Sequence, residues 1–236
     1  MHRTRADEPS HGRRVLLLPG LWMPRASMRW HAHRLRQAGY APHLFGYAPV
    51  TRGPDAVIPA LADALRTPTD VVAHSLGGLL ALRTLQRYPG LPVGRVVCLG
   101  SPLTGSAAAG GLASRALGAA CLGRSADLLR SGCPEWQGSA QVGVVAGEQP
   151  LGLGQFFGHF PGPNDGTVAV EETRLSGLAD HAVIPTSHSG LLFSEEAAQL
   201  ALSFLGEDRF AAQAQPTAAG GAARSVTDST RPPSGL

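Results

Sequence analysis

The sequence predicts an α/β protein in which helices cover both faces of a mostly parallel sheet, as a three-layer sandwich with a small inserted cap. Two observations favour this fold class. Short apolar runs alternate along the chain with segments of helical spacing, and the runs are almost continuously apolar, as in strands buried on both faces. A length of 236 residues, with 43% hydrophobic and 16% charged residues, fits a single globular domain.

Six apolar runs are expected to form the strands, and four segments between or after them the covering helices. The strands are expected at 14–18, 42–47, 69–73, 95–99, 141–146 and 181–185. The helices are expected at 26–38, 55–66, 76–88 and 189–204. Gly39 is a suitable C′ residue for the first helix, and Asp55 a suitable N-cap for the second. Functional residues should then gather beyond the carboxyl ends of the parallel strands.

One segment interrupts this alternation, and the two ends of the chain fall outside it. Residues 105–139 lie between two predicted strands and are too long for an ordinary loop. Because the segment is rich in Ala, Gly and Leu, we expect an inserted cap or lid; a peripheral helix pair is the alternative. Residues 1–12 and 207–236 cannot bury much apolar surface, so we expect disordered ends around a domain at 13–206.

The segment that says most about function is 72–78, with the sequence VAHSLGG. It places Ser75 between a predicted strand and a predicted helix, with Ala73 and Gly77 two positions away on either side. A serine between small residues on such a turn is typical of a nucleophile elbow, which exposes the hydroxyl at the top of the sheet. We expect Ala73 and Gly77 nearly to touch. A serine that only caps the helix would not require small residues at both positions.

A serine nucleophile requires a base that is close in space. Of the nine histidines, His188 is best placed, because it lies between the last predicted strand and the last predicted helix. His74 is adjacent to Ser75, so its side chain points away, and we expect it to line the substrate site. His159 and His181 are the alternative bases, and the five other histidines lie too early in the chain.

The base in turn requires a carboxylate that holds the imidazole in the correct tautomer. Asp165 lies in an Asn-Asp-Gly segment, 23 residues before His188, where a plain turn is the alternative interpretation. The chain order Ser75, Asp165, His188 is nucleophile, acid, base, as this type of fold requires. Glu148 and Asp180 are the alternative acids.

Two backbone N–H groups are expected to form an oxyanion hole. The N–H of Leu76 opens the helix after the serine, where the helix dipole favours a negative oxygen. The N–H of Leu21 follows Gly20, and a glycine lets the backbone approach a ligand closely. Trp22 and Met23 come next in the chain, and we expect them to bind the acyl group of a substrate.

The composition argues against several other functions. All 20 basic residues are arginines, and apart from the first fourteen residues they are scattered, so we expect no nucleic-acid binding. No apolar stretch approaches 18 residues, so we expect no transmembrane segment and a cytoplasmic location. No cluster of His and Cys has the spacing of a zinc site. Cys121 and Cys133 could pair in an oxidising compartment, but we expect free thiols, with Cys98 buried in a strand.

These motifs resemble those of the α/β-hydrolase superfamily, in its lipase and esterase branch. The sequence AHSLGG is similar to the lipase elbow, with Ala73 in place of the commoner glycine. Residues 100–106 (GSPLTGS) resemble the Gly-Thr-Pro-His-x-Gly-Ser stretch of bacterial lipases, with Leu103 where they often have histidine. The sequence NDGTV after Pro163 resembles their acid loop. Leu-Pro-Gly at 18–20 stands where many members carry His-Gly.

The resemblance covers about residues 14–205 and implies hydrolysis of a small-molecule or lipid ester, with no organic cofactor and no catalytic metal. The expected enzyme is a serine hydrolase that works through an acyl-enzyme formed on Ser75. His188 transfers the proton and Asp165 orients His188. Acyl transfer and thioester cleavage use the same residues and are alternatives, as is a non-catalytic relative of the fold. Nothing in the sequence pattern indicates an oligomeric state.

Overall fold

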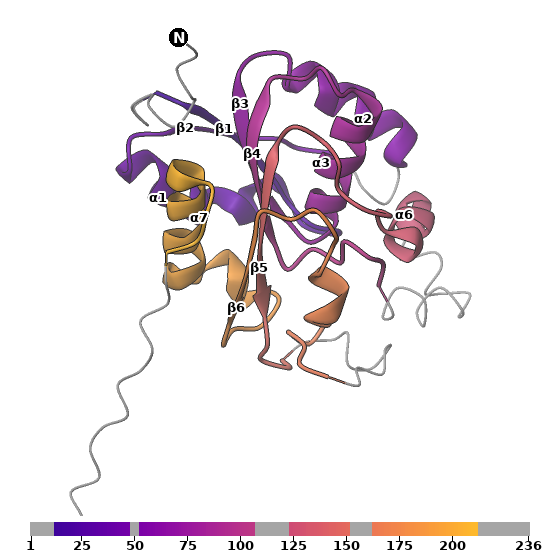
Figure 1. Cartoon of the computed structure of the whole chain (residues 1–236), viewed down its shortest axis with the longest axis vertical. Helices are drawn as coiled ribbons and strands as arrows, with labels where there is room; N and C mark the ends of the chain where they lie inside the picture. Colours follow the sequence, from indigo (N-terminus) through magenta and orange to yellow (C-terminus); the bar gives the residue numbers. More distant parts are fainter. Residues whose placement is uncertain (1–11, 48–51, 107–122, 152–161, 212–236) are drawn as a thin grey trace, which may run out of the picture.

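The computed structural model describes residues 12–47, 52–106, 123–151 and 162–211 (Figure 1). In this part of the chain six strands form one sheet in the order β2-β1-β3-β4-β5-β6, and every neighbouring pair is parallel. The predicted fold class is therefore confirmed. The strands are β1 Arg14–Leu18, β2 Ala41–Leu44, β3 Thr69–His74, β4 Val93–Leu99, β5 Gln141–Gly147 and β6 Asp180–Ile184.

Helices cover both faces of this sheet (Figure 1). On one face lie α1 (Arg29–Gln37) and α7 (Glu195–Glu207), and on the other α2 (Pro54–Ala64), α3 (Leu76–Arg87) and α6 (Ala126–Ser131). We call these the α1/α7 face and the α2/α3 face. Short 3₁₀ helices occupy Arg25–Met28 (η2), Gly123–Ser125 (η3), Glu171–Thr173 (η5) and Gly190–Leu192 (η6).

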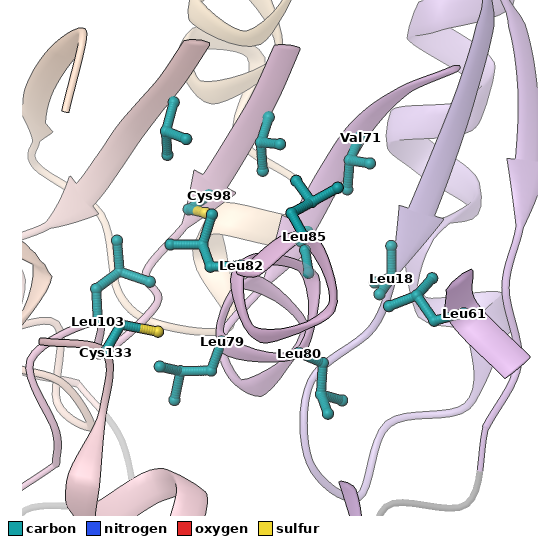
Figure 2. Close-up of a cluster of buried hydrophobic side chains, with 14 of the residues drawn as sticks. Leu18, Leu61, Val71, Leu79, Leu80, Leu82, Leu85, Cys98, Leu103 and Cys133 are labelled. Atoms are coloured by element: carbon teal, nitrogen blue, oxygen red, sulfur yellow. The ribbon is translucent and has the colours of Figure 1, made fainter. Parts of the chain in front are cut away.

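Two hydrophobic clusters form the core because side chains alternate across the strands. In β3, Val71 and Ala73 belong to the cluster on the α2/α3 face, and Val72 belongs to the one on the α1/α7 face. Figure 2 shows part of the first cluster, to which leucines of α3, Leu61 of α2 and side chains of the central strands such as Val71 and Cys98 contribute. Because the central strands are buried on both faces, they are almost continuously apolar, as the sequence showed.

The helix ends differ in part from those expected. Gly39 is confirmed as the C′ residue of α1: its φ is +86°, and the N–H of Tyr40 donates to the carbonyl of Leu35. The prediction that Asp55 caps α2 is wrong, because Gly53 is the N-cap and Pro54 the first helical residue. Proline suits that position, where the missing N–H costs no helical hydrogen bond.

The last predicted helix is two separate elements. The short helix η6 ends at Leu192, and α7 begins only at Glu195. Ser194 stands between them in an extended conformation, and its side-chain oxygen accepts a hydrogen bond from the N–H of Ala197. A serine that satisfies a free N–H of the first turn starts a new helix at this point.

The predicted insertion at 105–139 is described only in part, and residues 107–122, including Cys121, lie outside the described residues. Its later portion forms η3 and α6, and Leu128 and Leu129 of α6 join the core of the α2/α3 face. Beyond α6 the N–H of Cys133 donates to the carbonyl of Leu103 at 2.6 Å. A cap over the active site remains a prediction. Cys98 and Cys133 are both buried and free.

The folded chain extends past the boundary expected at residue 206. Asp208 forms an ion pair with the buried Arg95, and the ring of Phe210 packs against that of Phe204 at 5.1 Å between centroids. Residues 1–11 and 212–236, on which the remaining predictions of disorder fall, lie outside the described residues. None of the helices in the described part is long and apolar enough to cross a membrane.

Candidate active site

The direction of chain progression across the sheet reverses between β1 and β3. From β1 the chain passes to β2 on one side and then crosses back to β3 on the other, so the loops that follow β1 and β3 diverge. In parallel α/β sheets ligands bind beside such a switch point, at the carboxyl ends of the strands. The loop after β1 contains Gly20 and Leu21, and Ser75 directly follows β3.

Ser75 stands on a strained turn. Its φ of 53° and ψ of −123° lie in a region that residues with a side chain rarely adopt. Its N–H donates to the carbonyl of Leu99 at 2.9 Å, and its own carbonyl accepts from the N–H of Gly78 at 3.0 Å. His74 and Leu76 on either side are fully buried, whereas Ser75 is partly exposed. The turn thus brings the serine to the surface between two buried neighbours.

Gly77 must be small for a reason other than the predicted contact with Ala73. A Cβ at Gly77 would lie 2.8 Å from the carbonyl oxygens of both Leu18 and Pro19, and none of its three nearest atoms would belong to Ala73. The end of β1 therefore crosses directly over the start of α3. On the same side, a Cβ at Gly20 would lie 3.0 Å from the Cβ of Ser75. The loop after β1 is thus held close to the serine.

Asp165 and His188 form a buried pair. Nδ1 of His188 lies 2.7 Å from Oδ2 of Asp165, and Asp165 is 1% exposed. The other carboxylate oxygen accepts from the N–H groups of Thr167 at 3.0 Å and Val168 at 2.7 Å. A carboxylate held in this way keeps the proton of the neutral imidazole on Nδ1, which leaves Nε2 free to accept one.

Gly100, which follows β4, makes room for this pair. A Cβ there would lie 3.1 Å from Oδ2 of Asp165 and 3.2 Å from Nδ1 of His188, and its φ is +56°. The pair therefore lies at the end of β4, the strand next to β3, which Ser75 follows. Sequence reasoning did not give Gly100 this role, although a glycine directly after a central strand was a usable signal.

The alternative acids and bases lie elsewhere or make other contacts. Asp180 is the first residue of β6, so it lies at the amino ends of the strands, away from Ser75. There it accepts hydrogen bonds from the N–H groups of His181 and Phe210. Nε2 of His181 lies 2.7 Å from the hydroxyl of Thr173. Glu148 follows β5 and is exposed, and among the described residues its carboxylate forms no hydrogen bond with His188. His159 lies outside the described residues.

His74, the residue before Ser75, contacts His188. The rings of His74 and His188 are 4.6 Å apart between centroids, and Nε2 of His74 lies 3.0 Å from the backbone carbonyl oxygen of His188. Within the described part of the chain the hydroxyl of Ser75 forms no hydrogen bond with His188. Hydrogen bonds between a nucleophile and its base often tighten only when a substrate is bound.

The side chain of His74 is fully buried and so does not line an accessible surface. Its side chain has no exposed surface, so it cannot contact a substrate in this structure, contrary to the expectation from the sequence. Burial, followed by the neighbouring His188, holds the pKa of His74 well below its usual value. His31 of α1, which sequence reasoning excluded, is also buried, and its Nε2 lies 2.9 Å from the carbonyl oxygen of Leu191. Its place on the apolar face of the helix, beside Leu35, was the available signal.

The loop after β1 presents one exposed aromatic residue. Trp22 is 59% exposed and has a φ of 59°, whereas Leu21 and Met23 are partly buried against the two core clusters. The hydroxyl of Tyr47 donates to the carbonyl of Pro19 at 2.6 Å and so holds the start of this loop. Burial raises the pKa of Tyr47, which remains a neutral donor. Substrate binding by Trp22 and Met23, and the oxyanion hole, stay predictions.

Comparisons with known proteins agree with this architecture. The sequence profile described as the alpha/beta hydrolase family matches residues 15–233. No curated protein gives a significant match to the chain. Among solved structures, the lipase BlEst2 of Bacillus licheniformis is similar in its propeptide form, with a TM-score of 0.70 and 19% identity over 92% of this chain and 54% of that one. The present chain thus spans about half of the propeptide form.

Two further structures give the same result. The mature form of the same lipase has a TM-score of 0.66 and 18% identity, over 86% of this chain and 94% of that one. A metagenomic carboxyl esterase has a TM-score of 0.54 and 19% identity, over 76% of this chain and 65% of that one. At these identities the likeness establishes the fold.

Proposed function

The chain belongs to the alpha/beta hydrolase family, and we propose that it is a serine hydrolase that cleaves carboxylic esters through an acyl-enzyme on Ser75. The observation that carries the proposal is the buried Asp165–His188 pair, with Nδ1 and Oδ2 2.7 Å apart, near the strained turn at Ser75. A structural ion pair would not require a serine at positive φ beside it. Strain of this kind persists where it serves a mechanism.

In the proposed reaction the hydroxyl oxygen of Ser75 attacks the ester carbonyl while Nε2 of His188 takes its proton. The C–O bond to the alcohol then breaks, and His188 gives the proton to the leaving oxygen. A water molecule, deprotonated by His188, attacks the acyl-enzyme; the bond between the acyl carbon and the Ser75 oxygen breaks, His188 returns the proton to that oxygen, and the acid is released. The negative Asp165 keeps Nδ1 protonated and stabilises the imidazolium that forms twice in each cycle.

The N–H groups of Leu76 and Leu21 are the proposed oxyanion donors. Leu76 is the first residue of α3, so its N–H has no partner within the helix and adds to the positive end of the helix dipole. The contact between Gly20 and Ser75 supports the choice of Leu21, because it brings the backbone after β1 to the nucleophile. Each such donor typically contributes about 3 kcal/mol to transition-state stabilisation.

An apolar acyl group fits the surroundings of the site. Trp22, Leu151 and Phe193 are large, exposed apolar side chains, and they follow β1, β5 and β6, at the carboxyl edge of the sheet. Two of the similar structures are named as a lipase and a carboxyl esterase, which is consistent with an ester substrate here. Transfer of the acyl group to another acceptor, or cleavage of a thioester, would share every step up to the acyl-enzyme.

Labelling and turnover together test the proposal. A fluorophosphonate should modify Ser75 alone, as mapped by mass spectrometry, and chromogenic esters from acetyl to palmitoyl should be hydrolysed. Ser75→Ala should lower kcat by on the order of 10⁴- to 10⁶-fold with an unchanged melting temperature. Ser101→Ala is the matched control, since that serine is buried after β4. An adduct on another serine, or full activity of Ser75→Ala, would contradict the proposal.

A further inference from the structure

Two buried imidazoles outside the acid–base pair contact the loop that carries His188. Nε2 of His74 lies 3.0 Å from the carbonyl oxygen of His188, and Nε2 of His31 lies 2.9 Å from that of Leu191. The two histidines come from β3 and α1, two separate elements that both precede this loop in the chain. His74 has no exposed surface and His31 is 2% exposed. Neither side chain has a role in the steps proposed above.

His188 is held at three points. Its N–H donates to the backbone carbonyl of Asp165 at 2.9 Å, and its Nδ1 lies 2.7 Å from the carboxylate of the same residue. The third point is its carbonyl oxygen, which accepts from His74. Asp165 alone would therefore hold the backbone of His188 from one side, and His74 holds it from the strand that ends at the nucleophile. The position of Nε2 relative to Ser75 depends on both contacts.

The chemistry of the partners sets the protonation of both histidines. A carbonyl oxygen only accepts, so Nε2 of each ring must carry a proton. Nδ1 of His74 is buried, has no hydrogen-bond partner in the described part of the chain, and lies where a Cβ at Gly20 would be 3.0 Å away. A second proton there would have no acceptor. Burial also lowers the pKa of both rings.

A neutral donor is what this position requires. During the proposed reaction a positive charge forms on His188, whose ring is 4.6 Å from that of His74. A cation at position 74 would repel that charge, and an apolar residue would leave the carbonyl of His188 without its partner. A neutral imidazole with a proton on Nε2 holds the loop and leaves the imidazolium undisturbed.

We infer that His74 and His31 are positioning residues, which hold the loop 188–191 by neutral hydrogen bonds so that His188 faces Ser75. The effect of His74 is the larger, because it contacts His188 itself. The expected effect of these histidines on turnover rests on the proposed function. Their expected effect on the Asp165–His188 hydrogen bond does not depend on any substrate.

The test compares a variant that removes the donor with one that replaces it. His74→Leu fills a similar volume without a donor, and His74→Gln provides an amide N–H. We expect His74→Leu to lower kcat by about 10- to 100-fold with little change in KM, the size of effect that a displacement of about 1 Å can have. His74→Gln should recover most of this loss. His31→Leu should have the same effect to a smaller degree.

A second measurement does not require activity. In proton NMR spectra the Nδ1–H of His188, bonded to Asp165, should give a far-downfield resonance. The resonance should broaden or shift upfield in His74→Leu and return in His74→Gln. If the wild-type protein cleaves no ester, the proposed function fails, but the NMR measurement still tests whether His74 positions His188. His181→Leu is the control, since that histidine bonds to Thr173 and should affect neither kcat nor the resonance.

Three outcomes would overturn the inference. One is a folded His74→Leu protein, judged by circular dichroism, with wild-type kcat and an unchanged resonance. Another is a His74→Gln protein as impaired as His74→Leu, because the hydrogen bond would then not be the cause. The third is a rise in KM without a change in kcat, which would place His74 against the substrate. If His74→Leu does not fold, His31→Leu and His74→Gln decide by the same criteria.

Discussion

The sheet has an amino edge, where its parallel strands begin, and a carboxyl edge, where they end, and the two edges hold their buried polar groups in opposite ways. At the amino edge, buried charges are paired: Asp70 accepts from the side chain of Arg13 and the N–H of Arg95, and Arg95 pairs with Asp208. At the carboxyl edge, His31 and His74 are buried, and burial lowers the pKa of both so that they stay neutral. These and the hydroxyl of Tyr47 bond to backbone carbonyls.

The difference follows from what each edge must do. The paired charges tie the start of β1 and the chain after α7 to the central strands, and they need not change during function. At the carboxyl edge the buried carboxylate of Asp165 is hydrogen-bonded to His188. Further fixed charges nearby would compete with the charge that forms on His188, so neutral donors hold the loops there. Substitutions at the amino edge should therefore change stability, and those at the carboxyl edge turnover.

The largest effect is expected from the charged group at the carboxyl edge. Asp165→Asn preserves shape but lets His188 adopt the wrong tautomer, which should lower kcat by up to about 10⁴-fold at neutral pH. Steady-state kinetics on a short ester measure this. Glu148→Gln and Asp180→Asn are controls of near-constant volume and should have far smaller effects. A crippled Glu148→Gln enzyme beside a mildly affected Asp165→Asn enzyme would identify Glu148 as the acid.

The next effect is expected at the amino edge and concerns stability alone. Asp70→Asn leaves Arg13 without its buried partner, which should reduce the free energy of unfolding by about 3 kcal/mol. Urea unfolding measures this, and kcat at a temperature where the variant is folded should be unchanged. Asp63→Asn, which removes an exposed ion pair with Arg66, should cost less than about 1 kcal/mol. A loss of kcat in Asp70→Asn would show that the two edges are coupled.

Mild acid should reduce stability through the buried histidines of the carboxyl edge. The folded-state pKa values of His31 and His74 lie below the usual value of 6.5, so below that pH the unfolded chain takes up protons that the folded protein does not. Stability should therefore fall as the pH drops below about 6.5, by up to about 1.4 kcal/mol per pH unit for each histidine. Urea unfolding at about pH 7, 6 and 5 should show a smaller slope for His31→Gln than for the wild type. Equal slopes would mean that His31 is not held neutral.

A smaller effect is expected from the third neutral donor. Tyr47→Phe removes the hydrogen bond to Pro19 and loosens the loop that carries the proposed oxyanion donor Leu21. We expect kcat to fall by about 10-fold, equivalent to roughly 1.4 kcal/mol, with KM nearly unchanged. Phe45→Leu, which removes the ring beside Tyr47, is the control for a loss of packing without a loss of the hydrogen bond. An unchanged kcat would indicate that the loop is held by Gly77 and Gly20 alone.

The smallest effect is expected from the C-terminal segment. A protein ending at residue 211 keeps the ion pair of Asp208 and the ring contact of Phe210. Because 212–236 is poor in large apolar residues, its removal should change neither the melting temperature nor ester turnover. Differential scanning calorimetry and kinetics measure this. A drop of several degrees would show that the segment packs on the domain.

The sequence by itself determined the features that depend on local pattern. Continuous apolar runs predicted the strands, since a sheet covered on both faces leaves no polar side to a strand. The small residues around Ser75 predicted the strained turn, whose φ is 53°. The Asn-Asp-Gly turn, with its resemblance to the acid loop of lipases, favoured Asp165 over Glu148 and Asp180, and Nδ1 of His188 lies 2.7 Å from the carboxylate of Asp165. Each of these signals lies within a few residues or in the order of elements.

Only the tertiary structure decided how the site is held together. His74 and His188 are 114 residues apart in the chain, and His31 and Leu191 are 160 apart. No periodicity or motif connects such positions, because their contact depends on the crossing of strands and helices and not on neighbouring residues. The same holds for Gly77, which is small because Leu18 and Pro19 pass above it. Local pattern predicts which residue types occupy the site; the packing of distant elements decides which of them touch.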